Sequence, residues 1–109
     1  MNELNVKKRN GNICGFEMNK IMTAIKKAMD SCGMAYTEAV LSTLALKVVA
    51  DFQGNVHQDI IDIESIQDSV ERVLQDNGFH EVGKAYILYR KQHERARNME
   101  ETMFMIYPC

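Results

Sequence analysis

The sequence predicts an α+β fold that is mainly α: a four-helix bundle capped by a small N-terminal β-hairpin. Four segments after residue 17 repeat apolar residues at helical spacing. Before them, Asn10-Gly11 lies between two short segments that carry apolar residues, and Asn-Gly is a strong hairpin signal because both residues tolerate positive φ. The chain has 109 residues, 46% of them hydrophobic, so it is long enough for one domain with a single core.

The predicted hairpin carries a run of cations at its tip. Its arms supply four apolar side chains: Leu4, Val6, Ile13 and Phe16. Lys7, Lys8 and Arg9 lead into the turn, for which we expect type I′ geometry with positive φ at Asn10 and Gly11. Because an isolated two-stranded hairpin is marginally stable in water, it must pack on the helices.

Capping residues bound the first two predicted helices. The first spans about residues 19–32, with Asn19 as its N-cap and Gly33 directly after its end. The second begins after Thr37, ends near Gly54 and has a broad apolar face that indicates a core element.

Two further helices and one short strand are expected in the second half of the chain. A very short strand at residues 60–63 could pair beside the hairpin. The third helix begins after Asp62 or Ser65 and ends at residues 77–78, and the fourth covers about residues 80–98. The acidic side of the third helix is interpreted as a solvent-facing surface, made of Asp68, Glu71 and Asp76.

The net charge of −2 is distributed unevenly. Residues 1–27 hold six Lys and Arg against two Glu, residues 28–83 hold two cations against ten carboxylates, and residues 84–109 hold five cations against three carboxylates. If the two basic ends meet in space, they form a cationic site suited to phosphates. The alternative is that these charges are solvated helix faces.

Two local features favour the phosphate site. Lys20 falls in the first turn of a helix, where the helix dipole disfavours a cation unless an anion is bound nearby. Tyr89 precedes Arg90 and Lys91, and a ring beside two cations suits a base with its phosphates. The alternative for Tyr89 is a core tyrosine beside solvent-facing cations.

Motifs of catalysis are not found in the sequence. It has no Walker-type or dinucleotide-binding glycine motif, no zinc-protease or serine-hydrolase motif and no CxxC pair. We therefore expect a binding or regulatory module rather than an enzyme, with no catalytic residues and no metal site. No apolar run approaches 18 residues and no signal peptide is recognisable, so the expected location is cytoplasmic and off the membrane.

Several of these residues together resemble a known family. The opening run Val6-Lys7-Lys8-Arg9-Asn10-Gly11, then Phe16 and Asn19-Lys20-Ile21, is similar to the opening motif of the ATP-cone domain, and residues 85–91 resemble its closing helix. The resemblance covers about residues 4–97. It implies a four-helix bundle capped by a small sheet, with ATP or dATP bound between sheet and helices as an allosteric effector, and Mg²⁺ as a candidate companion of the phosphates.

The resemblance also implies site residues at the N-terminal end of the chain. Val6, Lys8 and Arg9 would contact the nucleotide from the hairpin, with both cations on phosphates. Lys20 would bind phosphate from the first helix, and Ile21 would line the base pocket.

Further site residues are implied nearer the C-terminus. Arg90 and Lys91 would reach the nucleotide from the fourth helix, and Gln67 stands where some reductases carry a phosphate-contacting histidine. Either Tyr86 or Tyr89 would touch the adenine, and the sequence leaves this choice open.

The family occurs at the N-terminus of many ribonucleotide reductases and in a bacterial repressor with a zinc ribbon. The missing CxxC pairs argue against the repressor, and the Tyr-Arg ending followed by residues 101–105 looks most like the anaerobic reductases.

Residues 1–98 would form the nucleotide-binding domain, and residues 99–109 a C-terminal tail or the start of a further region. Expected partners are a second copy of the chain or a catalytic reductase domain. The alternative is a small helical protein–protein interaction module with a degenerate or absent nucleotide site; nucleic-acid binding is disfavoured by the acidic middle segment.

Overall fold

The structure, a computed structural model, describes residues 3–100, with side chains for residues 3–94. Of the predicted tail, residues 99–109, the part from residue 101 onward lies outside the described residues, and residues 99 and 100 belong to the last helix. The elements, in chain order, are β1 (Asn5–Lys7), β2 (Ile13–Gly15), α1 (Met18–Ser31), α2 (Glu38–Phe52), the 3₁₀ turn η1 (Gln53–Asn55), β3 (Ile60–Asp62), α3 (Ile63–Asp76) and α4 (His80–Glu100). The mainly α fold with a small capping sheet is confirmed.

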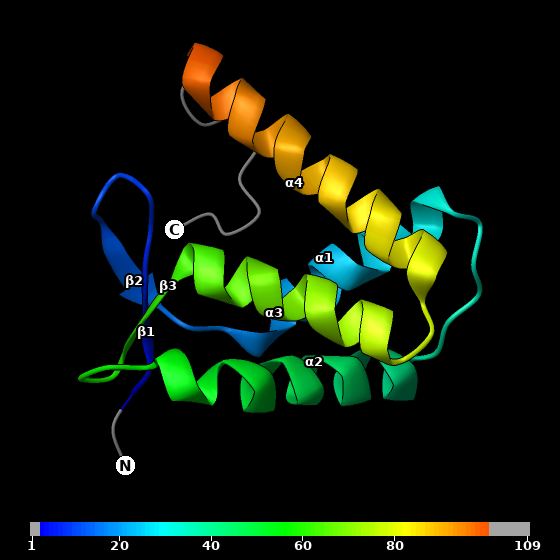
Figure 1. The fold of residues 1–109 in the computed structure, drawn as a ribbon, viewed down its shortest axis with the longest axis horizontal. Helices are drawn as coiled ribbons and strands as arrows, with labels where there is room; N and C mark the ends of the chain where they lie inside the picture. The colour runs from blue at the N-terminus through cyan, green and yellow to red at the C-terminus, as the bar shows by residue number, and fades with distance from the viewer. Residues whose placement is uncertain (1–2, 101–109) are drawn as a thin grey trace.

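The four helices form a closed bundle. α2 packs against α1 and α3, and α4 packs against the same two helices from the other side. Figure 1 shows the sheet at one end of this bundle, with the C-terminal half of α4 projecting beyond the other helices. The single core is therefore closed at that end by the strands.

The sheet has three short strands in the order β2–β1–β3. β1 pairs antiparallel with β2, where Val6 faces Cys14, and parallel with β3, where Val6 faces Ile61. Val6 and Ile61 are both fully buried in the core. The short third strand expected beside the hairpin is thus confirmed, and it brings the start of α3 next to the hairpin.

The hairpin turn differs from the type I′ prediction. Gly11 has a φ of 91°, but Asn10 does not have positive φ. The N–H of Gly11 donates to the carbonyl of Lys8 at 2.9 Å, so Arg9 and Asn10 are the central residues of the turn. The Asn10 side chain accepts from the N–H of Asn12 at 2.9 Å, which holds this tighter arrangement and leaves only the glycine in the left-handed region. Arg9 consequently lies at the corner of the turn.

The helix starts agree with the sequence only in part. Thr37 caps α2 as predicted, because its Oγ1 accepts from the N–H of Val40 at 3.2 Å. Asn19 is not the cap of α1: Glu17 takes that position, without a side-chain bond to the helix. Asp62 precedes α3 as predicted but also makes no side-chain capping bond, so it leaves the first N–H groups of α3 without a side-chain acceptor from the cap. None of the described helices combines the length and the apolar character needed to cross a membrane.

Candidate functional site

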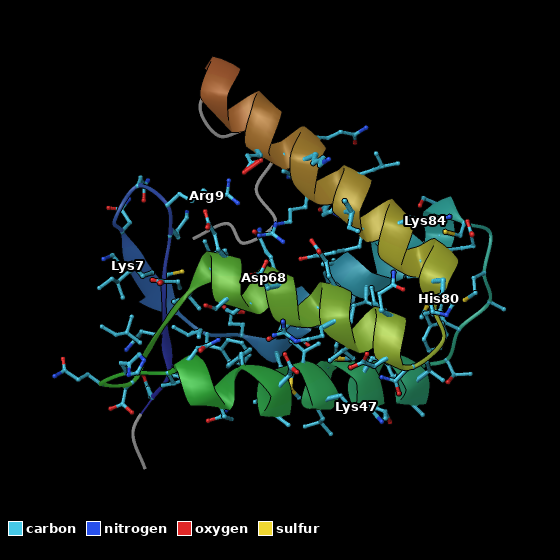
Figure 2. All side chains as sticks on the ribbon, viewed as in Figure 1. Lys7, Arg9, Lys47, Asp68, His80 and Lys84 are labelled. Carbon is cyan, nitrogen blue, oxygen red and sulfur yellow. The ribbon has the colours of Figure 1, made fainter. Side chains whose placement is uncertain are left out.

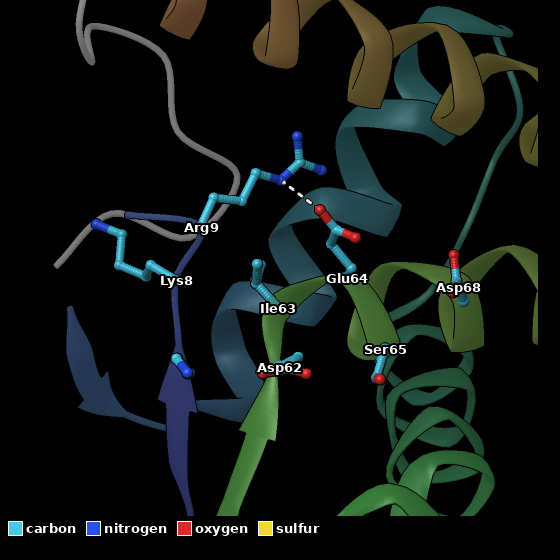
Figure 3. A pocket seen from close by; sticks show the side chains of 8 residues that line it. Lys8, Arg9, Asp62, Ile63, Glu64, Ser65 and Asp68 are labelled. Atoms are coloured by element: carbon cyan, nitrogen blue, oxygen red, sulfur yellow. Dashed lines mark ion pairs between the residues drawn. The ribbon is translucent and has the colours of Figure 1, made fainter. Parts of the chain in front are cut away.

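The hairpin tip and the start of α3 border a pocket of about 370 Å³. Its lining consists of Lys7, Lys8, Arg9, Asp62, Ile63, Glu64, Ser65 and Asp68. In Figure 3, Arg9 extends from the hairpin toward Glu64 on α3, whereas Lys8 points to the opposite side of the strand. Figure 2 shows Arg9 and Asp68 on the hairpin side of the bundle, and Lys84 and His80 at its far end.

Arg9 makes three polar contacts with two helices. Its Nη1 donates to Glu94 Oε2 of α4 at 2.5 Å, and its Nη2 donates to Gln67 Oε1 of α3 at 3.1 Å. Its Nε lies 3.1 Å from Glu64 Oε2. That distance makes an ion pair, but the N–H does not have hydrogen-bond geometry toward the carboxylate, and Nε is buried without a hydrogen-bond partner among the described residues. Arg9 therefore keeps N–H donors available for a further acceptor, and the buried Nε–H is one of them.

Gln67 connects this pocket with a second, much smaller cavity. Its side chain is 2% exposed, and its amide oxygen accepts from Arg9. The cavity of about 10 Å³ lies between α1, α3 and α4 and is lined by Lys20, Ile21, Ala24, Ile63, Ile66, Gln67, Val70 and Tyr86. Four residues predicted for the site are thus brought together around Gln67: Arg9, Lys20, Ile21 and Gln67 itself.

Tyr86 is the polar residue of α4 that lines this cavity. It is 1% exposed, and its hydroxyl makes no hydrogen bond within the described part of the chain. Burial raises the pKa of this phenol well above its usual range, so Tyr86 keeps its proton. Among the described residues Arg9 Nε, and not the Tyr86 hydroxyl, is the fully buried side-chain atom without a partner. Tyr86 is a candidate contact for a ligand because its hydroxyl is the polar group that α4 brings to this cavity.

Arg90 lies between α4 and α3 rather than at the hairpin. Its Nη1 contacts Asp68 Oδ1 at 2.9 Å and Glu71 Oε2 at 2.6 Å. Burial by itself would lower the pKa of Arg90, but hydrogen bonds to Glu71 and Asp68 outweigh it and raise the pKa above its usual value. The acidic side of α3 does face solvent at Asp68 and Asp76, which are exposed, whereas Glu71 is partly buried. Asp68 and Glu71 also bind this cation, which the sequence did not predict.

Tyr89 and Lys91 lie apart from the hairpin pocket. The Tyr89 ring packs against His93 with 4.0 Å between centroids, and Lys27 Nζ lies 5.9 Å from its centroid. Tyr89 lines a separate groove of about 510 Å³ between α1 and α4, and Lys91 is exposed. The structure does not bring these two residues together with Arg9.

Sequence reasoning missed the carboxylates that surround the cations. The hairpin pocket holds three cations and three carboxylates, and Glu94 adds a fourth negative charge on Arg9. Helical spacing contained a signal, because Glu64 and Asp68 are four residues apart on α3, as are Arg90 and Glu94 on α4. The same spacing could not identify Arg9 as a partner, since it lies 85 residues from Glu94 in the chain.

Comparison with known proteins identifies the family. The model of the ATP cone domain matches residues 4–95. The chain is 35% identical over 96 residues to the alpha subunit of ribonucleoside-diphosphate reductase from Chlamydia pneumoniae, which covers 83% of this chain and 9% of the relative. It is 40% identical over 103 residues to the vitamin B12-dependent ribonucleoside-diphosphate reductase from Thermoplasma acidophilum, covering 90% of this chain and 13% of the relative.

A third relative belongs to another kind of reductase. The chain is 33% identical over 100 residues to the anaerobic ribonucleoside-triphosphate reductase from Haemophilus influenzae, covering 89% of this chain and 13% of the relative. The chain thus spans only 9 to 13% of the length of these three relatives. With the family model covering most of the sequence, a sheet-capped four-helix bundle and cations gathered at the hairpin, the chain belongs to the ATP-cone family of allosteric nucleotide-binding domains.

Proposed function

We propose that this chain is a regulatory domain that binds ATP or dATP, with the phosphates at the hairpin tip and the adenine toward α1 and Tyr86. The observation that supports this most strongly is the contact between Arg9 Nη2 and Gln67 Oε1 at 3.1 Å. Gln67 lines the cavity beside Ile21, while Arg9 lines the hairpin pocket. One pair of side chains therefore joins a charged compartment, which includes three cations, to a mainly apolar one, and an adenine nucleotide needs both kinds of surroundings.

The hairpin pocket has the donors that phosphate oxygens need. Arg9 has a buried Nε that lacks a hydrogen-bond acceptor, and the first N–H groups of α3 receive no side-chain cap from Asp62. Hydrogen bonds from a guanidinium to phosphate are charge-assisted and stronger than neutral ones. Helix N-termini favour anions for the same electrostatic reason. Lys20 from α1 would add positive charge, and Lys8 would do so once its side chain turns from the opposite side of the strand toward the phosphates.

For the base we assign Tyr86 rather than Tyr89. Tyr86 shares its cavity with Ile21 and Gln67, whereas Tyr89 lines a different groove. The cavity of about 10 Å³ has room for roughly one water molecule, so α1, α3 and α4 must separate to admit a base. The Tyr86 hydroxyl would then offer a hydrogen bond that it does not make in the described structure.

Arg90 and Lys91 would act outside the phosphate site in this arrangement. Arg90 is held by Asp68 and Glu71, and Asp68 also lines the hairpin pocket. Its role would be to position α4 against α3. Among the described residues no three potential metal ligands are gathered, so we assign no protein ligand to Mg²⁺.

The regulation would operate by population shift. A nucleotide that binds one arrangement of the domain more tightly favours that arrangement, and by linkage favours whatever assembly goes with it. We propose a ribonucleotide reductase as the parent or partner, with residues 1–98 as the regulatory domain. The residues after Tyr89-Arg90 favour the anaerobic class, although the three relatives come from different kinds of reductase. The relevant assembly would be self-association or contact with a catalytic domain.

Calorimetric titration with ATP tests the proposal. The wild-type chain should bind, and Arg9→Gln should weaken binding by about tenfold or more, because a hydrogen bond to a charged group contributes roughly 1.5–3 kcal/mol. Arg72→Gln is the matched control: it removes the same charge and also breaks an ion pair, but on the α2–α3 side of the bundle. Absence of heat with wild-type chain at millimolar ATP would overturn the function. Equal binding by Arg9→Gln would overturn the site.

A second candidate function is a protein–protein interaction module with a degenerate or absent nucleotide site. Leu88 is 60% exposed and lines the groove between α1 and α4, where a partner could cover it. The same titration separates the two candidates, because a module without a nucleotide site gives no heat with ATP.

A further inference from the structure

The C-terminal half of α4 contacts the hairpin through the ion pair between Glu94 and Arg9. Glu94 belongs by its number to the C-terminal half of α4, and its carboxylate accepts from Arg9 Nη1 at 2.5 Å. Figure 1 shows that this half of the helix projects beyond the other helices. The two residues are 85 positions apart in the chain. A contact of this kind couples the position of α4 to whatever else Arg9 binds.

Phosphates and Glu94 need the same guanidinium. Nη1 donates to Glu94 and Nη2 to Gln67, and Nε has no hydrogen-bond partner among the described residues, so phosphates that approach Arg9 from this side meet the Glu94 carboxylate on the same guanidinium. A triphosphate at Arg9 would also lie beside the negative charges of Glu64 and Glu94, and like charges at such short range repel. The pocket as it stands has no excess of cations over carboxylates to offset this repulsion.

Of the two carboxylates on Arg9, Glu94 is the one that can leave. Glu64 lies in the first turn of α3, where the helix dipole favours a carboxylate, and its contact with Arg9 lacks hydrogen-bond geometry. Glu64 and Glu94 are both about half exposed, at 57% and 48%, so exposure does not distinguish them. Glu94 differs because it has no helix N-terminus to hold it and because it takes an N–H of Arg9, and an exposed carboxylate can exchange that contact for water at little cost. Its departure frees an N–H donor on Nη1 of Arg9.

We propose that Glu94 is a competitive latch: it occupies Arg9 in the absence of nucleotide, and phosphates displace it, releasing the C-terminal half of α4 from the hairpin. This rests on the proposed function and adds its route of transmission. The nucleotide phosphates and the Glu94 carboxylate compete for the guanidinium of Arg9 and repel each other, so the binding of one weakens the binding of the other. Nucleotide binding at the hairpin would therefore change the position of the C-terminal half of α4.

The first test compares ATP titrations of wild-type chain, Glu94→Gln and Glu81→Gln. Glu81 is the matched control, because it is also an α4 glutamate paired with a cation, but at the other end of the helix. Removal of the competitor should tighten ATP binding by Glu94→Gln about two- to fivefold, the factor expected for loss of an exposed ion pair. Glu81→Gln should bind as wild type.

The outcomes separate this inference from the function on which it rests. Binding by wild type with unchanged or weaker binding by Glu94→Gln would overturn the latch and leave the nucleotide site standing. A comparable gain in Glu81→Gln would also overturn it, because the effect would then come from net charge. No binding by any of the three proteins would overturn the proposed function itself.

Hydrogen exchange provides a second measurement that does not depend on affinity. In wild-type chain, ATP should speed amide exchange in residues 91–100 of α4, because the tie to the hairpin is lost. In Glu94→Gln the same amides should already exchange fast without ATP and change little when it is added. Slower or unchanged exchange in wild type on saturation with ATP would overturn the latch.

Discussion

Arg9 lies where three elements of the fold meet. Arg9 and Asn10 are the central residues of the hairpin turn. From this position the Arg9 side chain reaches α3 and α4, where it contacts Gln67 and Glu94. The run of cations at the hairpin could be predicted from sequence, but the direction of the Arg9 side chain could not. Direction depends on which residues form the corner of the turn, and the structure has that corner one residue earlier than the type I′ prediction.

Tyr86 gives a prediction at the scale of one hydroxyl group. Tyr86→Phe should weaken ATP binding by about two- to tenfold, since a net hydrogen bond contributes roughly 0.5–1.5 kcal/mol. Because the hydroxyl makes no hydrogen bond within the described residues, the free energy of unfolding without nucleotide should not fall. Calorimetry and urea unfolding measure the two quantities.

Tyr89→Phe is the control for this substitution. Tyr89 lies three residues after Tyr86 on α4 and lines another groove, so its hydroxyl should not affect ATP binding. Weakening by Tyr89→Phe together with normal binding by Tyr86→Phe would reverse our assignment of the base contact.

At the scale of elements, an N-cap was predicted correctly where the capping side chain and the N–H that it accepts from lie in the same helical turn. Thr37 caps α2 as predicted because the bond to Val40 lies within the same turn. Asn19 failed as the cap of α1, although its residue type is favoured there. Phe16 and Met18 both pack against the core, and their packing starts the helix at Met18 instead. Tertiary contact thus overrode a local preference at that helix start.

The link between α2 and α3 carries a prediction about pH. Arg72 binds Asp51 through Nε and Nη2, with the shortest contact at 2.7 Å, and this hydrogen bonding lowers the pKa of Asp51. A lowered folded-state pKa contributes stability above the unfolded-state pKa, and that stability is lost as pH falls through the folded value. Asp51→Asn should therefore cost about 0.2–1 kcal/mol near neutral pH, as for other exposed pairs.

The pH dependence distinguishes this link from a general effect of the substitution. The difference in unfolding free energy between wild type and Asp51→Asn should shrink toward zero in acid, once the pH is below the lowered pKa of Asp51. In an Arg72→Gln background, Asp51→Asn should have little effect at any pH. A difference that persists unchanged in acid would contradict an ion-pair origin. Urea unfolding across pH measures it.

The acidic face of α3 shows what periodicity can and cannot predict. Spacing correctly grouped Asp68 and Glu71 on one side of the helix. It could not reveal that Arg90 of α4 lies opposite them, at 2.9 and 2.6 Å. A helical pattern identifies residues on one face, whereas the neighbour of that face depends on how the bundle closes.

At the scale of the whole molecule, the uneven charge along the chain acquires a different meaning. The hypothesis from the sequence was that the two basic ends of the chain meet around a phosphate. In the structure the hairpin does approach α4, but Arg9 meets Glu94 there, while Arg90 pairs with α3. The acidic middle segment enters the same region through Glu64 and Asp68. Carboxylates thus lie between cations that would otherwise repel one another. In the arrangement we propose, a bound nucleotide would change the ion pair between Arg9 and Glu94.

The central claim is that one adenine nucleotide spans the hairpin pocket and the cavity beside Gln67. Amide chemical shifts measured by NMR during titration with ATP test it most directly, because they report every region of the chain at once. We predict the largest changes at residues 6–9, at Lys20 and Ile21, at residues 62–68 and at Tyr86. Changes concentrated around Lys27 and Tyr89 in the α1–α4 groove, with the hairpin unaffected, would contradict it.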